Sequence, residues 1–264
     1  METDRVRVQG ESGPPVLLLP GGAESCDGFF PGLPEGLAAD PGCRVILQDR
    51  PGTGAAADGS LADAAAYVSG LIDELGCGPV VVVGQSLGGA VAVLLAREYP
   101  EKVAGLVLLD PTPINDVRLA AQVEQTMRRT ARVASIPVLG GLVKAGLRAS
   151  AAKIVRRQQL RPDCAEAQAK IGQLDIPQLG RAVEGLTELA KSFEEVELPR
   201  LPAVVVTADR KPDNKIRQAH TRLAAALGAP IVCWPGATHS VHLDHPDETL
   251  AVVRDLVSSI KPAR

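Results

Sequence analysis

Ser86 is the side chain in this sequence whose surroundings most clearly suggest covalent chemistry. It stands at the centre of residues 84–88, Gly-Gln-Ser-Leu-Gly, which follow an apolar run and precede a helical pattern. A tight turn from strand to helix strains the backbone of its central residue and exposes the hydroxyl, while small neighbours let the adjacent chain pass closely. The helix N-terminus also favours developing negative charge. The pattern predicts Ser86 as a nucleophile, and a Gly-Ser loop without chemistry is the alternative interpretation.

A serine hydroxyl needs a general base, and histidine commonly takes that role. Of the four histidines, His239 follows the last predicted strand, in a loop from which it could reach Ser86. His220 falls inside a helical pattern and is expected at an ordinary surface position. The spacing H-x-x-H-x-x-H from His239 through His242 to His245 could also suit a metal ion. The loop placement and the serine motif argue against metal binding, so His239 is the predicted base.

Strands and helices alternate along most of the chain and must position these side chains. Runs that are apolar throughout suit strands covered on both faces, so the alternation predicts an α/β fold with a doubly wound, mostly parallel sheet. Ser60 is expected to cap the first long helix, with Asp63 near its N-terminus. The predicted strands are residues 16–20, 44–49, 80–85, 103–110, 203–208 and 231–234, and the predicted helices are 61–75, 87–99, 213–227 and 247–260.

The alternation stops between the fourth and fifth predicted strands. Residues 112–199 show helical patterns interrupted by prolines and paired glycines, without a convincing strand. An all-helical insertion at this point would cover the C-terminal edge of the sheet, where such sheets bind ligands. We therefore predict a core made of residues 1–111 and 200–264, with residues 112–199 as a helical cap.

The predicted cap is locally basic. From Arg118 to Arg161 the sequence has ten basic residues and a single acidic residue, Glu124. A solvated helical face is the ordinary explanation for such a run. The alternative is a docking surface for an acidic partner, such as a carrier protein, or for an anionic substrate.

The order of four motifs resembles that of the α/β-hydrolase family. The resemblance covers nearly the whole chain outside the cap, and in that family the catalytic histidine matches His239. The residues that carry it are Pro20-Gly21-Gly22 after the first predicted strand, Asp49-Arg50-Pro51-Gly52-Thr53-Gly54 after the second, the Ser86 motif, and the His239 loop that ends at Pro246.

The resemblance also implies an oxyanion hole built from backbone N–H groups. Those of Gly22 and Leu87 are the candidates. The family's usual His-Gly before this loop is Pro20-Gly21 here, a departure that backbone donors tolerate. The turn that contains Asp49 and Arg50 is expected to be structural, and no chemistry is assigned to it.

The triad acid is open between two aspartates. The family commonly places it after the strand that follows the cap, as G-x-x-D, but the matching position is Lys211, which cannot stabilise an imidazolium. Asp209 lies two residues earlier and Asp213 two residues later. A second family layout places the acid after the strand that follows the nucleophile helix, where Asp110 stands. We favour Asp110 over Asp209. Without a catalytic role, Asp110 would be a capping residue at the strand exit and Asp209 a turn residue before the following helix.

Composition limits the remaining function classes. The chain of 264 residues suits one large domain or a core with an insertion; its net charge of −3 and 2% aromatic content disfavour nucleic-acid binding. Apolar runs such as residues 16–19 and 80–83 are too short to cross a bilayer, and residues 1–10 lack a signal layout. A soluble, cytoplasmic protein is expected. Five cysteines without a CxxC pair indicate reduced, buried thiols.

The predicted reaction is acyl transfer to water. His239 takes the Ser86 proton and the serine attacks an ester, thioester or amide carbonyl. An ester is the default, because alkoxide leaving groups need less protonation than amines. The substrate is expected to be a small molecule, with no cofactor and no metal. The alternatives are a lyase, cyclase or acyltransferase on the same frame, a carrier-protein thioesterase that docks through the basic cap, and a binding protein that has lost the chemistry.

Overall fold

The described part of the chain, residues 6–54 and 59–260 of a computed structural model, contains one seven-stranded sheet. Its strand order is β1-β3-β2-β4-β5-β6-β7, and only β1 runs antiparallel to its neighbour. The predicted α/β class with a mostly parallel sheet is confirmed. The strands are β1 (Val6–Gln9), β2 (Pro15–Leu19), β3 (Arg44–Gln48), β4 (Val80–Gln85), β5 (Val103–Leu109), β6 (Ala203–Thr207) and β7 (Ile231–Cys233).

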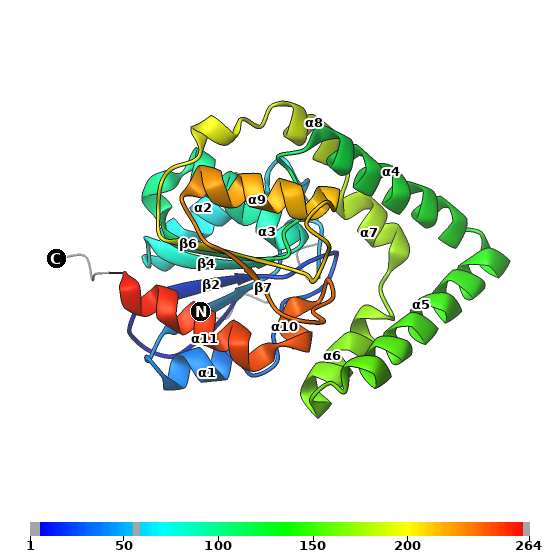
Figure 1. Cartoon of the computed structure of the whole chain (residues 1–264), viewed down its shortest axis with the longest axis horizontal. Coiled ribbons are helices and arrows are strands. Elements are labelled where there is room, and N and C mark those ends of the chain that lie inside the picture. Colours follow the sequence, from blue (N-terminus) through cyan, green and yellow to red (C-terminus); the bar gives the residue numbers. More distant parts are fainter. Residues whose placement is uncertain (1–5, 55–58, 261–264) are drawn as a thin grey trace.

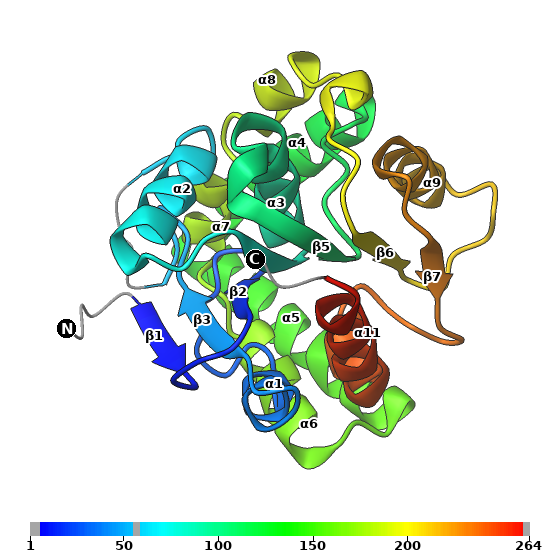
Figure 2. The same ribbon diagram turned by 90° about the vertical axis from the view of Figure 1, so that its left-hand side faces the viewer.

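Helices cover both faces of this sheet, and its inner strands are accordingly apolar on both faces (Figure 2). In β2, Leu17 and Leu19 pack into the core under α2, α3 and α9, whereas Val16 and Leu18 pack toward α1 and α11. Successive side chains of a strand point to opposite faces, so an uninterrupted apolar run fills two cores at once. These helices are α1 (Leu33–Ala39), α2 (Ala64–Leu75), α3 (Leu87–Glu98), α9 (Lys215–Leu227) and α11 (Pro246–Ser259), with the short α10 (Val241–Asp244) before α11.

A run of helices lies between β5 and β6, and we call it the helical insertion. In Figure 1, α4 and α5 extend away from the sheet and meet at an outer corner, and α6 returns beside α10. Among the described residues, no helix combines the length and apolar character that crossing a membrane requires. The insertion consists of α4 (Val117–Ala134), α5 (Pro137–Gln158), α6 (Pro162–Ile171), α7 (Ile176–Ala182) and α8 (Leu186–Lys191), and a 3-10 turn (Glu195–Glu197) follows it.

Two features near the N-terminus differ from the sequence-based expectation. The edge strand β1 was not predicted, because four alternating residues give too short a pattern. The helix expected to start at residue 61 starts at Ala64. Ser60 does not cap it: its hydroxyl bonds the carboxylate of Asp63 at 2.6 Å, which closes a turn and leaves Asp63 at the N-cap position.

Candidate active site

Ser86 lies in the turn between β4 and α3. Its backbone has φ 50° and ψ −115°, a strained conformation for a residue with a side chain. Gly84 and Gly88 make the turn possible. A Cβ on Gly84 would lie 2.5 Å from the carbonyl oxygen of Gly88, and a Cβ on Gly88 would collide with that of Leu19. The motif therefore places the serine hydroxyl at the end of β4, as the sequence predicted for a nucleophile turn.

Asp110 lies next to Ser86 because their strands are paired in register. Gln85 pairs with Leu109, so the residues that follow both strands are neighbours. The N–H of Ser86 donates to the carbonyl of Leu109 at 3.1 Å, and the N–H of Asp110 donates to that of Val206 at 2.7 Å. Asp110 has φ 44°, in the left-handed region.

His239 connects the two. Its Nε2 lies 2.9 Å from Ser86 Oγ, and its Nδ1 lies 2.6 Å from Asp110 Oδ2. Gln85, the residue before the serine, donates from Nε2 to the carbonyl of His239 at 2.9 Å and anchors the loop. Asp209, the other candidate acid, instead accepts from the N–H of Gly236 at 2.9 Å. The structure thus brings Ser86, His239 and Asp110 into one hydrogen-bonded series.

Arg210 is a member of this cluster that the sequence reasoning missed. Its guanidinium binds the Asp110 carboxylate through both terminal nitrogens: Nη1 donates to Oδ1, and Nη2 donates to Oδ2 at 2.6 Å. The N–H of Ala208 also donates to Oδ1, at 2.9 Å. Burial alone would raise the pKa of Asp110, but the hydrogen bonds and charges of Arg210 and His239 outweigh it and hold the pKa well below its usual range. Asp110 is therefore ionised, buried and fixed in orientation.

The prediction that His220 occupies the surface is wrong. The side chain is fully buried on the inner face of α9. Its Nε2 donates to the carbonyl of Pro111 at 2.7 Å, so Nδ1 accepts from the hydroxyl of Thr207 at 2.9 Å. Burial lowers the pKa of His220 despite the Asp110 carboxylate 3.7 Å away, which favours the neutral ring. His220 thus supports the strand end beneath Asp110.

The loop after β2 passes directly over Ser86. A Cβ on Gly21 would lie 3.0 Å from Ser86 Cβ and would collide with the Gln85 amide, so only glycine fits. Gly22 follows with φ 54°. Leu87, at the first position of α3, has no acceptor one turn back for its N–H. The structure therefore places both predicted oxyanion donors, Gly22 and Leu87, in segments that adjoin Ser86.

Arg50 explains how this loop is held. The buried guanidinium donates from Nε to the carbonyl of Pro20 at 3.2 Å and from Nη2 to that of Gly22. Its neighbour Asp49 accepts from the N–H of Cys26 at 2.6 Å. Both residues of this turn therefore fix the chain around the oxyanion loop.

The remaining histidines of the H-x-x-H-x-x-H spacing point to different partners. His242 is buried and stacks on Phe29, with ring centroids 4.8 Å apart, and burial lowers its pKa to about 3. Nε2 of His245 lies 3.2 Å from the carbonyl oxygen of Pro235. Within residues 6–54 and 59–260, no three His, Cys, Asp or Glu side chains are grouped to hold a metal ion.

The helical insertion contacts both loops of the site. Leu179 of α7 lies 3.7 Å from the position that a Cβ on Gly22 would take. Gln158, the last residue of α5, donates to the carbonyl of Gly236 at 2.8 Å, three residues before His239. A substrate at Ser86 would therefore meet the insertion as well as the core.

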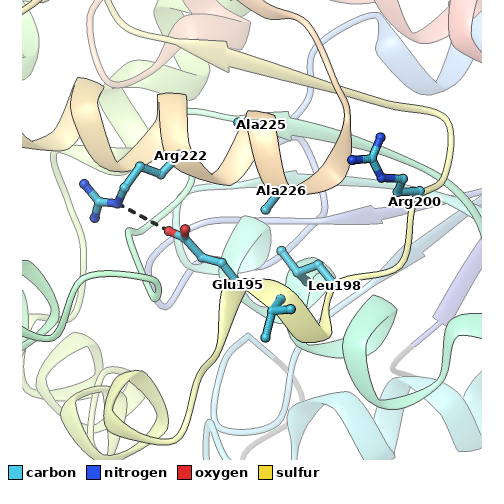
Figure 3. A pocket seen from close by; sticks show the side chains of 7 residues that line it. Glu195, Leu198, Arg200, Arg222, Ala225 and Ala226 are labelled. Atoms are coloured by element: carbon cyan, nitrogen blue, oxygen red, sulfur yellow. Dashed lines mark hydrogen bonds and ion pairs between the residues drawn. The ribbon is translucent and has the colours of Figure 1, made fainter.

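A pocket of about 440 Å³ lies elsewhere, between the 3-10 turn and α9 (Figure 3). Across it, Arg222 Nε lies 3.4 Å from Glu195 Oε1. None of its lining residues is hydrogen-bonded to Ser86, His239 or Asp110. We therefore do not assign it to the candidate active site. The lining residues are Glu195, Val196, Leu198, Arg200, Arg222, Ala225 and Ala226.

A mostly parallel sheet with a nucleophile turn at its centre defines an α/β-hydrolase, and comparison with known proteins agrees. Residues 16–252 match the alpha/beta hydrolase family, and the chain belongs to that family. It is similar to a 2-(acetamidomethylene)succinate hydrolase of Mesorhizobium japonicum, with 29% identity over 81% of this chain and 75% of the relative.

Two further comparisons are with a curated hydrolase and with a solved structure. A 2-hydroxy-6-oxo-6-phenylhexa-2,4-dienoate hydrolase of Comamonas testosteroni is 36% identical over 38% of this chain, and the match spans only 37% of that relative. The solved structure of a thermophilic esterase from Thermogutta terrifontis has a TM-score of 0.74 and 23% identity, over 97% of this chain and 93% of the esterase. At that identity the structural likeness concerns the fold.

Proposed function

We propose that the chain is a serine hydrolase that cleaves a carboxylic ester or a related acyl bond through an acyl-enzyme on Ser86. The observation that carries this proposal is the continuous hydrogen-bonded series from Ser86 Oγ through His239 to Asp110. A serine on a strained turn, a base within 2.9 Å of it and a buried carboxylate behind the base are the parts that acyl transfer needs.

In the proposed first half-reaction, His239 Nε2 takes the proton of Ser86 as Oγ attacks the carbonyl carbon. The N–H groups of Gly22 and Leu87 stabilise the oxyanion of the tetrahedral intermediate. His239 then protonates the leaving alkoxide, and the acyl-enzyme remains. In the second half-reaction, His239 removes a proton from water, the resulting hydroxide attacks the acyl carbon, and Ser86 regains its proton as the acid leaves.

Asp110 acts in this proposal as the residue that fixes the tautomer of His239. Its Oδ2 accepts from Nδ1, so Nε2 presents its lone pair to Ser86. The carboxylate also stabilises the imidazolium that forms. Because Arg210 and the N–H of Ala208 occupy its other lone pairs, Asp110 stays ionised and does not itself take the proton.

An ester is the substrate class that we propose first. The chemistry of the site supports it, because an alkoxide leaves with less proton assistance than an amine. A lyase, cyclase or acyltransferase would use the same side chains, so mass analysis of the products must show acid plus alcohol. An isomer of the substrate as product would contradict hydrolysis.

Separate Asp110→Asn and Asp209→Asn variants test the proposal. Both aspartates follow neighbouring strands, which makes the second substitution a matched control. With p-nitrophenyl esters of varied chain length, Asp110→Asn should lower kcat by about 10⁴-fold, because the His239 tautomer is no longer fixed. Asp209→Asn should lower kcat by less than about tenfold.

Labelling provides an independent readout. A fluorophosphonate should modify the wild-type protein at Ser86 and leave a Ser86→Ala variant unmodified. Labelling of neither protein, or loss of kcat in neither aspartate variant, would contradict the proposed triad. Thermal unfolding of each variant separates loss of chemistry from loss of fold.

A further inference from the structure

The outward face of α5 carries apolar side chains at its N-terminal end. Val138, Leu139 and Leu142 are 77%, 39% and 67% exposed. At 100° per residue they fall within an arc of about 100°. The opposite side of the helix packs inward: Ala151 is buried and lies in contact range of Gly172, at the end of α6. Most of Val138 and Leu142, and part of Leu139, therefore remains outside the packing of the insertion.

The end of α4 extends this surface. Val133 and Ile136, at and after the C-terminus of α4, are 42% and 50% exposed. Together the five residues form what we call the apolar corner: Val133, Ile136, Val138, Leu139 and Leu142. Single exposed apolar residues are common on protein surfaces, but five within ten positions form a patch that suggests a binding site. Figure 1 shows the junction of α4 and α5 at the outer end of the molecule, far from the sheet.

Basic residues continue the same face along α5. Arg156 lies five helical turns from Val138, on the same side of the helix, with Lys153 and Arg157 beside it, and all three are exposed. The helix has five basic residues and no acidic one. Within the described part of the chain, none of these five forms an ion pair with Asp or Glu. The face thus runs from an apolar end to a positively charged end.

We propose that the apolar corner and α5 bind the surface of an anionic lipid bilayer. The apolar side chains would enter the boundary between headgroups and acyl chains, and Lys153, Arg156 and Arg157 would contact lipid phosphates. A bilayer fits this face better than an acidic protein does, because the apolar side chains project from a convex corner and lipids can close around them. The basic residues extend along a helix of about 33 Å, which suits a flat charged surface.

The surface is connected to the candidate active site. Gln158, the last residue of α5, bonds the loop that carries His239 through the carbonyl of Gly236. A bilayer held against α5 would bring membrane-dissolved acyl esters near Ser86, and this part of the inference rests on the proposed function. The binding itself requires no catalysis, so a Ser86→Ala variant should bind equally well.

Sedimentation with sucrose-loaded vesicles tests the binding. Vesicles of phosphatidylglycerol and phosphatidylcholine in equal amounts should bind the wild-type protein at least about tenfold more tightly than pure phosphatidylcholine. Raising the salt to 0.5 M should weaken the binding by at least about tenfold. Absence of binding to the anionic vesicles would overturn the proposal, as would binding that is equally strong to both vesicles.

Paired variants locate the surface. Val138→Ser with Leu142→Ser, and separately Arg156→Gln with Arg157→Gln, should each weaken vesicle binding by at least about tenfold. The matched controls are Val196→Ser, which removes a valine that is 89% exposed, and Lys211→Gln with Lys215→Gln, which removes two exposed charges from another region.

The controls should bind like the wild type. Equal losses in controls and α5 variants would overturn the assignment of the surface. Capture by an immobilised acidic carrier protein that the α5 variants abolish, with no vesicle binding by the wild type, would identify a protein partner and refute the bilayer. If vesicles bind but hydrolysis of vesicle-borne esters is absent even in the wild type, the proposed function fails while the lipid surface stands.

Discussion

The Arg210→Gln variant tests how far Asp110 depends on its guanidinium partner. In the structure both guanidinium nitrogens bind the carboxylate, which is almost completely buried. Glutamine carries no charge, and its side chain ends two bonds short of the guanidinium Nη atoms, so the ion pair and both hydrogen bonds are lost. The carboxylate would keep the N–H of Ala208 and Nδ1 of His239 as partners.

The expected loss follows from burial. Breaking a buried ion pair on one side costs about 3–5 kcal/mol, and the hydrogen bonds that Ala208 and His239 continue to make with the carboxylate reduce this to about 2–3 kcal/mol. The direction in which this loss of stability changes with pH is determined by Asp110, whose folded-state pKa is depressed. Its stabilisation is present above its unfolded-state pKa of about 3.9 and is lost as the pH falls through the folded-state value. The difference in unfolding free energy between wild type and variant should therefore be largest near pH 7 and should become smaller below about pH 4.

Urea unfolding at pH 7 and pH 3 measures this difference in unfolding free energy. Ester hydrolysis at pH 7 should show a kcat about tenfold lower for Arg210→Gln than for the wild type. Lys211→Gln is the matched control, because it removes an exposed positive charge from the next residue and touches no part of the site. A loss below about 0.5 kcal/mol at pH 7, the usual scatter of surface substitutions, would refute the reasoning. A gap of equal size at both pH values would refute the role assigned to the Asp110 charge.

Three further substitutions test other contacts. Gly21→Ala would place a Cβ 3.0 Å from that of Ser86, so kcat for p-nitrophenyl esters should fall by at least about 100-fold; activity near the wild-type value would contradict the close passage of this loop. Gln85→Ala removes the hydrogen bond to the carbonyl of His239 and should slow fluorophosphonate labelling by about tenfold, whereas an unchanged rate would show that the loop needs no such anchor. Burial lowers the pKa of His242 to about 3 from 6.5, so this side chain costs the wild type up to about 1.4 kcal/mol of unfolding free energy per pH unit as the pH falls below 6.5. His242→Phe should lose less stability between pH 6.5 and 4.5 in urea titrations, and identical pH slopes would argue against a neutral buried ring.

Much of the sheet could be predicted because its strands are apolar on both faces. The six predicted runs match β2 to β7 to within one residue at either end, since the turn residues that end each run are also the structural ends. The same reasoning missed β1, which pairs only at an edge and has intermediate or exposed side chains. A strand that is not buried carries no continuous apolar run.

The site could be predicted only where a motif carries its own geometry. Ser86 is marked by the glycines that its turn requires, but nothing around Arg210 indicates that its side chain folds back onto Asp110, a residue 100 positions earlier. For His220 a signal was present: Leu223, Ala224 and Leu227 follow it at helical spacing and are all buried. That apolar stripe places His220 on the inner face of α9, and its polarity led to the wrong prediction.

The loop after β7 delivers His239 from one of the least secured parts of the sheet. β7 has three residues, all at least partly exposed, and forms the edge of the sheet. The loop is held by three different segments: Gln158 and Gln85 donate hydrogen bonds to its carbonyls, and Asp209 accepts one from the N–H of Gly236. Segments with few buried contacts open at lower free energy than the whole protein. On warming, local opening of this edge should therefore determine how long the protein stays active. Ser86 would remain in its turn inside the core while His239 leaves its position, so activity should be lost at a lower temperature than the global fold.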